Sequence, residues 1–319
     1  MDSVTVILPA RLHLGFLDLN GSLGRKFGSI GIAIDGPQTR IAMSRAKTQS
    51  ISGPESERAS VYLTRMQEAL GMRAPIQLDI LKVIPAHAGL GSGTQLALAV
   101  AAGVRQIANL PTDPRNDAFL LERGARSGIG IGLFNGGGAV LDGGRKDNGK
   151  PPPVISRIPF PPGWRILLVF DHRAKGMNGS AETHAFAKLP AFPDVEAAHL
   201  CRLALMKAWP ALIEEDIADF GSAIAEMQRR LGDHFAAAQG GRYSSAAVAE
   251  IAGILEAAGA HGCGQSSWGP TGFAFAASVR EAEVLADAVR NRATVLGLTL
   301  QIVAGNNQGA VISTGRKNQ

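Results

Sequence analysis

The sequence predicts an α+β fold with two domains. Segments with the two-residue period of strands and segments with the period of helices are mixed along the chain, without a regular β–α–β repetition. At 319 residues the chain is long enough for two modest domains. A polar stretch at 145–153 ends in three prolines and is the best candidate for an exposed connection. We therefore expect an N-terminal domain over 1–153 and a C-terminal domain over 154–319.

The first half is expected to consist of strands with helices between them. Apolar residues alternate with polar ones in the expected strands, and Asn20-Gly21 and Asp35-Gly36-Pro37 predict turns between them. Helices are expected at 55–70, at 96–107 and from Asp113, because proline at position 114 suits a first helical turn. The expected strands cover 4–8, 11–19, 30–34, 39–43, 76–81 and 136–144.

The second half is expected to contain longer helices and a second group of strands. A glycine-rich loop at 262–272 leads into the apolar segment 273–276, which is typical of a buried strand. The other expected strands cover 165–170, 298–304 and 309–313, and the expected helices lie near 193–208, 211–231, 244–259 and 280–292.

The composition excludes several classes of protein. The net charge is +5, but no dense basic run occurs and aromatic residues make up 5% of the chain, so we expect no nucleic-acid partner. No apolar run reaches membrane-spanning length, and residues 1–4 do not resemble the start of an export signal. Cys201 and Cys263 are the two cysteines, without the spacing of a zinc site or a disulfide framework. These features predict a cytoplasmic protein.

The most informative segment is a glycine-rich loop between an expected strand and an expected helix. Glycines let the backbone fold closely around an anion, and amide groups at a helix start then face its oxygens. Hydroxyl and amide side chains add further donors. The alternative is a tight turn that binds no ligand. The expected phosphate-binding residues are Gly89, Leu90, Gly91, Ser92, Gly93, Thr94 and Gln95.

Several basic residues are further candidates. Arg11 and His13 share one face of an expected strand, and they are either ligands for a phosphate or carboxylate, or a surface charge and a core histidine. Arg25 and Lys26 lie in a loop bounded by glycines, which either closes over an anion or is a solvated turn. Arg126 precedes a glycine-rich bend and either forms a pair of hydrogen bonds to an anion or is a charge at a helix end.

The glycine loop resembles the phosphate-binding motif of the GHMP kinase superfamily. Pro85 and the run Gly89-Leu90-Gly91-Ser92 fit that motif, whereas Gly93 replaces its second serine. The segment 262–272 is similar to the superfamily's C-terminal glycine motif. The resemblance implies a domain like domain 2 of ribosomal protein S5, followed by a ferredoxin-like domain.

A closer resemblance is to a branch of the superfamily that does not consist of kinases, the β-ribofuranosylaminobenzene 5′-phosphate synthases. The kinases of the superfamily commonly carry a Ser-Gly-x-Asp segment whose aspartate acts on the substrate hydroxyl. In this sequence Gly130 stands at that position and has no side chain to accept a proton. Some homoserine-type kinases also lack that aspartate. The segments that together resemble the synthases, in this order, are 9–18, 89–95, 126–130 and 264–270.

This resemblance implies a reaction. The family joins 5-phosphoribosyl 1-diphosphate (PRPP) to 4-aminobenzoate, or to 4-hydroxybenzoate in related enzymes, with release of carbon dioxide and diphosphate. The pathway leads to tetrahydromethanopterin-type one-carbon carriers. Mg²⁺ is expected with the diphosphate, held by Asp18 and Glu122 or mostly by substrate and water. A homodimer is expected from the superfamily. An ATP-dependent kinase and a metabolite sensor without activity remain alternatives.

The resemblance also assigns the candidate residues to roles. Arg11, His13, Asp18 and Arg126 are expected at the reacting groups, and Arg25, Lys26 and Ser127 join the glycine loop in binding PRPP. Trp268 would pack on the aromatic substrate or fill the space between the domains. The expected aromatic-substrate residues are Gln265, Ser266, Ser267 and Trp268.

Overall fold

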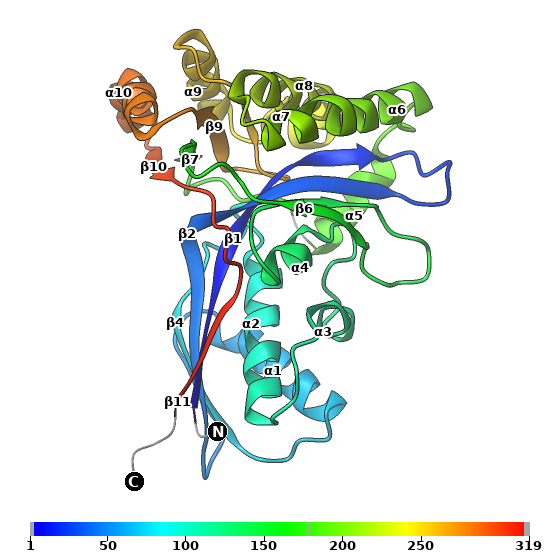
Figure 1. The fold of residues 1–319 in the computed structure, drawn as a ribbon, viewed down its shortest axis with the longest axis vertical. Coiled ribbons are helices and arrows are strands. Elements are labelled where there is room, and N and C mark those ends of the chain that lie inside the picture. The colour runs from blue at the N-terminus through cyan, green and yellow to red at the C-terminus, as the bar shows by residue number, and fades with distance from the viewer. Residues whose placement is uncertain (1–2, 178, 316–319) are drawn as a thin grey trace.

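The computed structural model describes residues 3–177 and 179–315, except for the side chains of residues 180–183. Its strands form two sheets, and the helices lie on both (Figure 1). In the larger sheet the order is β11-β1-β2-β4-β3, with β5 beside β2 and β6 beside β5. Its strands are β1 (Ser3–Asp18), β2 (Phe27–Arg45), β3 (Ser50–Ser52), β4 (Ile76–Lys82), β5 (Ala139–Asp142), β6 (Val154–Ile158) and β11 (Val311–Gly315).

The first two strands are longer than predicted. The expected strands 4–8 and 11–19 are one strand, β1, which shifts register against β2 at Pro9/Ala10 and at His13/Gly15. The expected turn at 35–37 is wrong, because β2 continues through it, whereas the turn after Asp18 does connect the two strands as a hairpin. The end of β1 and the start of β2 extend beyond the rest of the larger sheet. They lie beneath the helices at the top of the picture (Figure 1).

Helices cover one face of the larger sheet. They are α1 (Ser56–Ala69), α2 (Ser92–Ile107), α3 (Pro114–Leu120) and α4 (Ile129–Phe134). Buried residues of α2 such as Leu96 and Val100 pack against Val6 and Met43 of the sheet. Asp113 begins α3 by accepting a hydrogen bond from the amide of Asn116, at 3.2 Å, as a helix N-cap. The short α4 was not predicted, because glycines interrupt its apolar pattern.

The smaller sheet is built from the second half of the chain, in the order β10-β7-β9-β8. Its strands are β7 (Arg165–Phe170), β8 (Cys263–Gln265), β9 (Gly272–Ala276) and β10 (Thr299–Val303). The helices are α5 (Gly179–Lys188), α6 (Asp194–Leu203), α7 (Trp209–Ile213), α8 (Ile217–Gln239), α9 (Ala246–Ala257) and α10 (Val279–Val295), with a π-helical segment at Ala204–Ala208.

Alternating residues of the smaller sheet face two different cores. Leu167 of β7 packs into the core formed with α9 and α10. Its neighbour Leu168 packs into a core that also holds Phe220 of α8 and Leu12 and Leu14 of β1. This second core joins the two halves of the chain.

The predicted domain boundary at 153/154 stays a prediction. β6 follows residue 153 yet pairs with β5, and β11 pairs with β1, so the larger sheet receives two strands from the second half. Of the expected exposed connection, 146–150 is exposed, but Pro151 and Pro152 are buried. No described helix is both long and apolar enough to cross a membrane.

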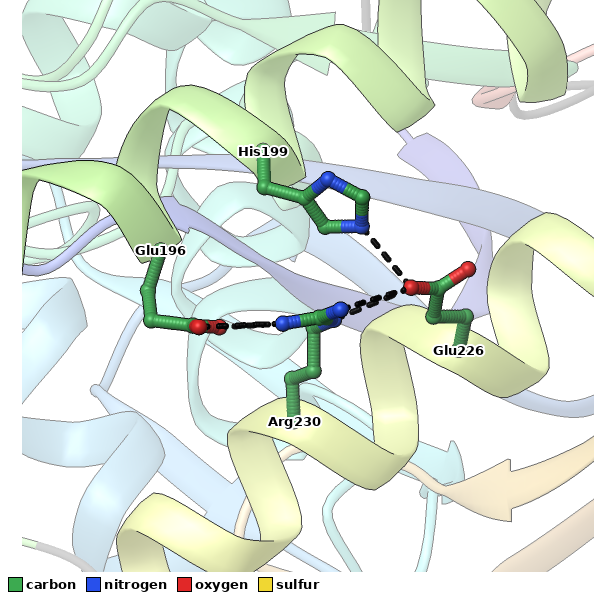
Figure 2. Close-up of polar contacts among 4 residues, drawn as sticks. All are labelled: Glu196, His199, Glu226 and Arg230. Atoms are coloured by element: carbon green, nitrogen blue, oxygen red, sulfur yellow. Dashed lines mark hydrogen bonds and ion pairs between the residues drawn. The ribbon is translucent and has the colours of Figure 1, made fainter.

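A polar network holds α6 against α8 (Figure 2). Arg230 forms ion pairs with Glu196, at 2.8 Å, and with Glu226, at 3.0 Å. The same Glu226 carboxylate also lies 2.8 Å from Nε2 of His199. Glu226 thus connects residues from both helices.

Candidate active site

A cavity of about 540 Å³ opens where the two halves of the chain meet. Its wall combines β1, the loop before α2, the loop that joins α3 to α4, and the loops after β7 and β8. Most of the predicted site residues come together here. The described residues that line it are Arg11, His13, Phe16, Arg58, His87, Gly89, Gly91, Ser92, Gly93, Thr94, Glu122, Arg123, Gly124, Ala125, Arg126, Ser127, Gly130, Gly176, Met177, Gly179, Ser267, Trp268 and Gly269.

The glycine loop forms one wall of this cavity. Gly89 has a φ of +76°, and a Cβ atom there would come within 2.2 Å of the Ser266 carbonyl oxygen, so no larger residue fits without movement. The Ser266 hydroxyl donates to the Gly89 carbonyl at 2.8 Å and fixes the loop against the segment after β8. Of the loop predicted at 262–272, residues 263–265 instead form β8, and Ser266 supports the glycine loop.

Helix α2 begins at the cavity. The amide of Gln95 donates to the Gly91 carbonyl at 3.0 Å, so the amides of Ser92, Gly93 and Thr94 precede the first such bond of the helix. Amides at this position and the helix dipole favour an anion. Leu90 and Gln95 are each 1% exposed and do not line the cavity. Of the loop residues, these two belong to the core beneath it.

Arg11 lies along the glycine loop. Its amide donates to the Leu90 carbonyl at 3.1 Å, and its Nη1 donates to the Gly89 carbonyl at 3.2 Å. A Cβ atom at position 91 would come 2.6 Å from Cγ of Arg11. The side chain thus borders the cavity beside the start of α2.

His13 is a buried histidine with no hydrogen-bond partner for its ring. It is 1% exposed and lines the cavity, and neither Nδ1 nor Nε2 has a partner among the residues that the structure describes. Burial lowers the pKa of His13 well below its usual 6.5, and the charge of Arg11 lowers it further. The imidazole is therefore neutral, with one nitrogen able to donate and the other able to accept.

A cluster of aromatic rings borders the cavity next to His13. The Phe16 ring lies 4.7 Å from it, edge to face, and also contacts Phe186 at 6.1 Å. Trp268 is 3% exposed and packs on Phe186 and Phe235 at 5.2 and 4.5 Å. Because Phe16 and Trp268 both line the cavity, this side of it suits a flat aromatic group.

Four arginines line the cavity, and sequence analysis missed two of them. Arg58 lies on α1, and Arg123 follows α3. The guanidinium of Arg126 lies 5.7 Å from the centre of the Phe186 ring. The sequence did contain a signal for Arg123, since it stands in the run Glu-Arg-Gly-Ala-Arg before the glycine-rich bend. Arg58 is part of an ordinary helix, and no local pattern marks it.

A buried carboxylate supports Ser127 and the start of α4. Asp142 accepts hydrogen bonds from the amides of Gly128, at 2.8 Å, and Gly144, at 3.0 Å, and from the hydroxyl of Ser29. Burial raises the pKa of Asp142, although these bonds favour its charged form. The Ser127 hydroxyl bonds to that of Ser29 at 2.7 Å, and Ser127 lines the cavity.

Besides Leu90 and Gln95, five predicted site residues do not line this cavity. Asp18 accepts from the amides of Asn20 and Gly21 at 2.7 and 2.9 Å, which stabilises the hairpin turn. The remaining four are Arg25, Lys26, Gln265 and Ser266. Arg25 donates to the Gly144 carbonyl at 3.0 Å, and Gln265 accepts from the amide of Ser244 at 2.7 Å.

The described residues offer little to a metal ion by themselves. They include no group of three or more acidic, histidine or cysteine side chains placed to hold one. Among them, Glu122 is the carboxylate that lines the cavity, and it pairs with Arg65 at 3.0 Å. Any metal would thus depend on oxygens from a bound substrate.

Comparison with known proteins agrees with this architecture. Residues 58–139 match the family described as GHMP kinases N terminal domain, and residues 208–294 match GHMP kinases C terminal. The β-ribofuranosylphenol 5′-phosphate synthase of Archaeoglobus fulgidus is 34% identical over 281 residues, covering 84% of this chain and 86% of the relative. The chain belongs to this synthase family, within the GHMP kinase superfamily.

Two further comparisons support that assignment and the fold. The protein of the same name from Methanocaldococcus jannaschii is 36% identical over 250 residues, covering 69% of this chain and 75% of the relative. The structure of homoserine kinase from Cytophaga hutchinsonii superposes with a TM-score of 0.70 at 18% identity, covering 98% of each chain. The predicted α+β fold of the GHMP type is confirmed, and the family is one of enzymes.

Proposed function

We propose that this enzyme transfers the phosphoribosyl group of PRPP to 4-aminobenzoate or 4-hydroxybenzoate, forming a C-riboside 5′-phosphate with release of carbon dioxide and diphosphate. The observation that carries the proposal is a single cavity with an anion-binding side and an aromatic side. The amides at the start of α2 and four arginines form the first side, and Phe16, His13 and Trp268 border the second.

The reaction requires positioning more than covalent chemistry. The bond between ribose C1 and the diphosphate oxygen breaks, and the diphosphate leaves with the electron pair. The ring carbon that bears the carboxylate then bonds to C1, and loss of carbon dioxide returns an electron pair to the ring. Fixed donors that stabilise the departing diphosphate, and a wall that holds the ring against C1, supply the catalysis.

His13 is suited to the electron-donating end of the aromatic substrate. A neutral imidazole accepts a hydrogen bond from a phenol or aromatic amine, and this increases the electron density that reaches the ring. Both ring nitrogens lack a partner within the described residues, so binding of a polar group would also satisfy a buried donor and acceptor.

Mg²⁺ is part of the proposal. Bound to the diphosphate, it would neutralise charge on the leaving group. Phosphate oxygens and water would provide most of its ligands. Glu122, a carboxylate that lines the cavity, would be the protein ligand. The protein's arginines would share the same task of charge neutralisation.

The cavity favours this reaction over phosphoryl transfer from ATP. A Cβ atom at Gly130 would lie 3.1 Å from Cγ2 of Thr94, so an aspartate there would need Thr94 to move. The position at which many kinases of the superfamily carry their carboxylate is thus closely packed.

We further propose a cytoplasmic homodimer that acts in tetrahydromethanopterin biosynthesis, without nucleic-acid or membrane partners.

The test is incubation of the purified protein with PRPP, Mg²⁺ and 4-aminobenzoate labelled in its carboxyl group, in parallel with labelled 4-hydroxybenzoate. We expect labelled carbon dioxide, diphosphate and a riboside phosphate in equal amounts, without ATP. The preferred acceptor is the one with the higher kcat/KM. Production of ADP from ATP and a small hydroxylated substrate, with no gas from either benzoate, would refute the proposal.

A further inference from the structure

Arg58 and Arg123 form a pair beside one residue of the glycine loop. A Cβ atom built on Gly93 would lie 3.7 Å from Nη1 of Arg123 and 3.9 Å from Nη1 of Arg58. Gly93 belongs to the first turn of α2, and residues 92–94 of that turn line the cavity. Two guanidinium groups therefore stand next to the positive end of a 16-residue helix.

This pair is separate from the other two arginines that line the cavity, Arg11 and Arg126. Arg11 contacts Gly91, and Arg126 lies over the ring of Phe186. Gly91 and Gly93 are two residues apart, and each lies next to different arginines. The glycine loop is thus bordered by cationic groups at both of these positions.

Neighbouring side chains hold the pair in place. Arg58 forms an ion pair with Glu55 at 3.2 Å. Arg123 donates to the Tyr62 hydroxyl, and its guanidinium lies 5.2 Å from the centre of the Tyr62 ring. Nε of Arg123 is buried and has no hydrogen-bond partner within the described ranges of the chain. A guanidinium held by an aromatic ring still has N–H groups to donate to a ligand. Because the side chain is already fixed, it loses less conformational freedom on binding, and the hydrogen bond to the ligand is stronger.

The charge around the pair is positive on balance, because Glu55 pairs with Arg58 and Glu122 pairs with Arg65, which leaves the charge of Arg123. Within the described part of the chain, Arg123 bonds to a tyrosine hydroxyl and to no carboxylate. The ring of buried His13, which also lines this cavity, has no hydrogen-bond partner in the described part of the chain, which independently points to a ligand. Amides at a helix start accommodate one phosphoryl group. Two guanidinium groups directly beside them match a second phosphoryl group joined to the first.

We propose that Arg58 and Arg123 bind the terminal phosphoryl group of a diphosphate, whose inner phosphoryl group lies at the amides of residues 92–94. The identity of that diphosphate as part of PRPP rests on the function proposed above. Binding here gives the leaving group the amides of residues 92–94 and two guanidinium groups as donors.

The experiment measures binding by calorimetry with two probes, inorganic diphosphate and ribose 5-phosphate. The variants are Arg58→Gln and Arg123→Gln, with Arg290→Gln as a control that removes one exposed charge on α10. Each cavity variant is expected to weaken diphosphate binding about tenfold or more, as the loss of a charge-assisted hydrogen bond requires. The affinity for ribose 5-phosphate is expected to stay within about twofold of the original, because it carries no diphosphate.

A fourth variant separates binding from folding. Tyr62→Phe removes the hydroxyl that Arg123 contacts but keeps both guanidinium groups, and we expect a loss of diphosphate affinity smaller than about threefold. Thermal unfolding of every variant shows whether it is folded. If Arg123→Gln does not fold, the result for Arg58→Gln decides.

Three outcomes would overturn the subsite: no diphosphate binding by the unaltered protein, equal weakening of both probes, or the same loss in Arg290→Gln. The outcome is independent of turnover. Diphosphate binding that needs both arginines, without carbon dioxide release, would support the subsite and refute the proposed function. Carbon dioxide release, together with a diphosphate affinity that does not depend on the two arginines, would support the proposed function and refute the subsite.

Discussion

Gly91 lies directly against Arg11, and a Cβ atom on Gly91 would come 2.6 Å from Cγ of the arginine. The residue has a φ of +79°, where a side chain is strained even without neighbours. The contact therefore fixes the shape of the glycine loop and the position of a cavity-lining guanidinium together.

Replacing Gly91 with alanine should impair PRPP binding. The strain of about 1–2 kcal/mol is expected to shift either the loop or Arg11, and a small displacement of binding groups costs about tenfold or more in KM for PRPP. Steady-state kinetics measures it. Gly240→Ala is the control, since Gly240 has a φ of +84° but no atom within 4 Å of its Cβ position, and its kinetics should be unchanged. Unaltered PRPP kinetics in Gly91→Ala would contradict the role of the loop.

His13 should make stability depend on pH. Its pKa is lowered in the folded protein by burial and by Arg11, so the unfolded chain binds a proton more readily. This contribution is complete above the ordinary pKa of about 6.5 and is lost as the pH falls below it, at up to about 1.4 kcal/mol per pH unit. Urea unfolding between pH 7.5 and 5.5 should show a smaller loss in His13→Leu than in the original protein. Parallel curves would show that His13 makes no such contribution.

The ion pair between Arg105 and Asp117 should be important for stability. It joins α2 to α3, and Asp117 receives hydrogen bonds from Nε and Nη2 of the arginine at 2.7 to 2.8 Å, with side-chain exposures of 9% and 3%. Asp117→Ala leaves a buried charge unpaired and should lower the free energy of unfolding by about 3–5 kcal/mol. Urea denaturation measures this.

An exposed pair on α10 provides the comparison for that prediction. Asp287 and Arg290 pair with side-chain exposures of 69% and 62%. Asp287→Ala should therefore change the free energy of unfolding by about 0.5 kcal/mol or less. A similar loss in both alanine variants would show that burial does not determine the contribution of the pair.

The network on α6 and α8 should contribute a small, pH-dependent amount (Figure 2). The hydrogen bond from His199, and then Arg230, lowers the pKa of Glu226 below its usual 4.5. The stabilisation is therefore present above that pH and is lost as the pH falls through the lowered pKa. Glu226→Gln should lower the free energy of unfolding by less than about 1 kcal/mol at pH 7.

The free energies of unfolding of Glu226→Gln and the original protein should become more similar at acidic pH. At about pH 3 the free energies of unfolding of Glu226→Gln and the original protein should differ less than at pH 7, because protonation removes the carboxylate's charge. Urea unfolding at both pH values measures the difference. A difference that grows on acidification would contradict the assigned direction.

The glycine loop could be predicted because its physical cause is local. A glycine at position 91 is required by the backbone of the turn itself, and the strand before it and the helix after it are visible in the sequence. The length of β1 was harder to predict, because Pro9 resembled the end of a strand. The paired β2 carries the ladder past it through a register shift.

The arginines show the limit of local reasoning. Arg58 and Arg123 approach the same glycine only because α1 and α3 both pack beside α2, which no spacing within the chain reveals. Asp18 illustrates how one residue type fits two interpretations. It has the charge expected of a metal ligand, but the sequence Asp-x-Asn-Gly also suits a turn in which the carboxylate accepts nearby amides, and that is its observed contact.

The pairing of β1 with β11 constrains the order in which the protein can assemble. Residues 3–7 leave the ribosome long before their partners on this side, residues 311–315. Until then this edge of β1 exposes unpaired backbone groups to any other nascent strand. A fragment cut after residue 153 would keep that open edge permanently, and it would be prone to aggregate.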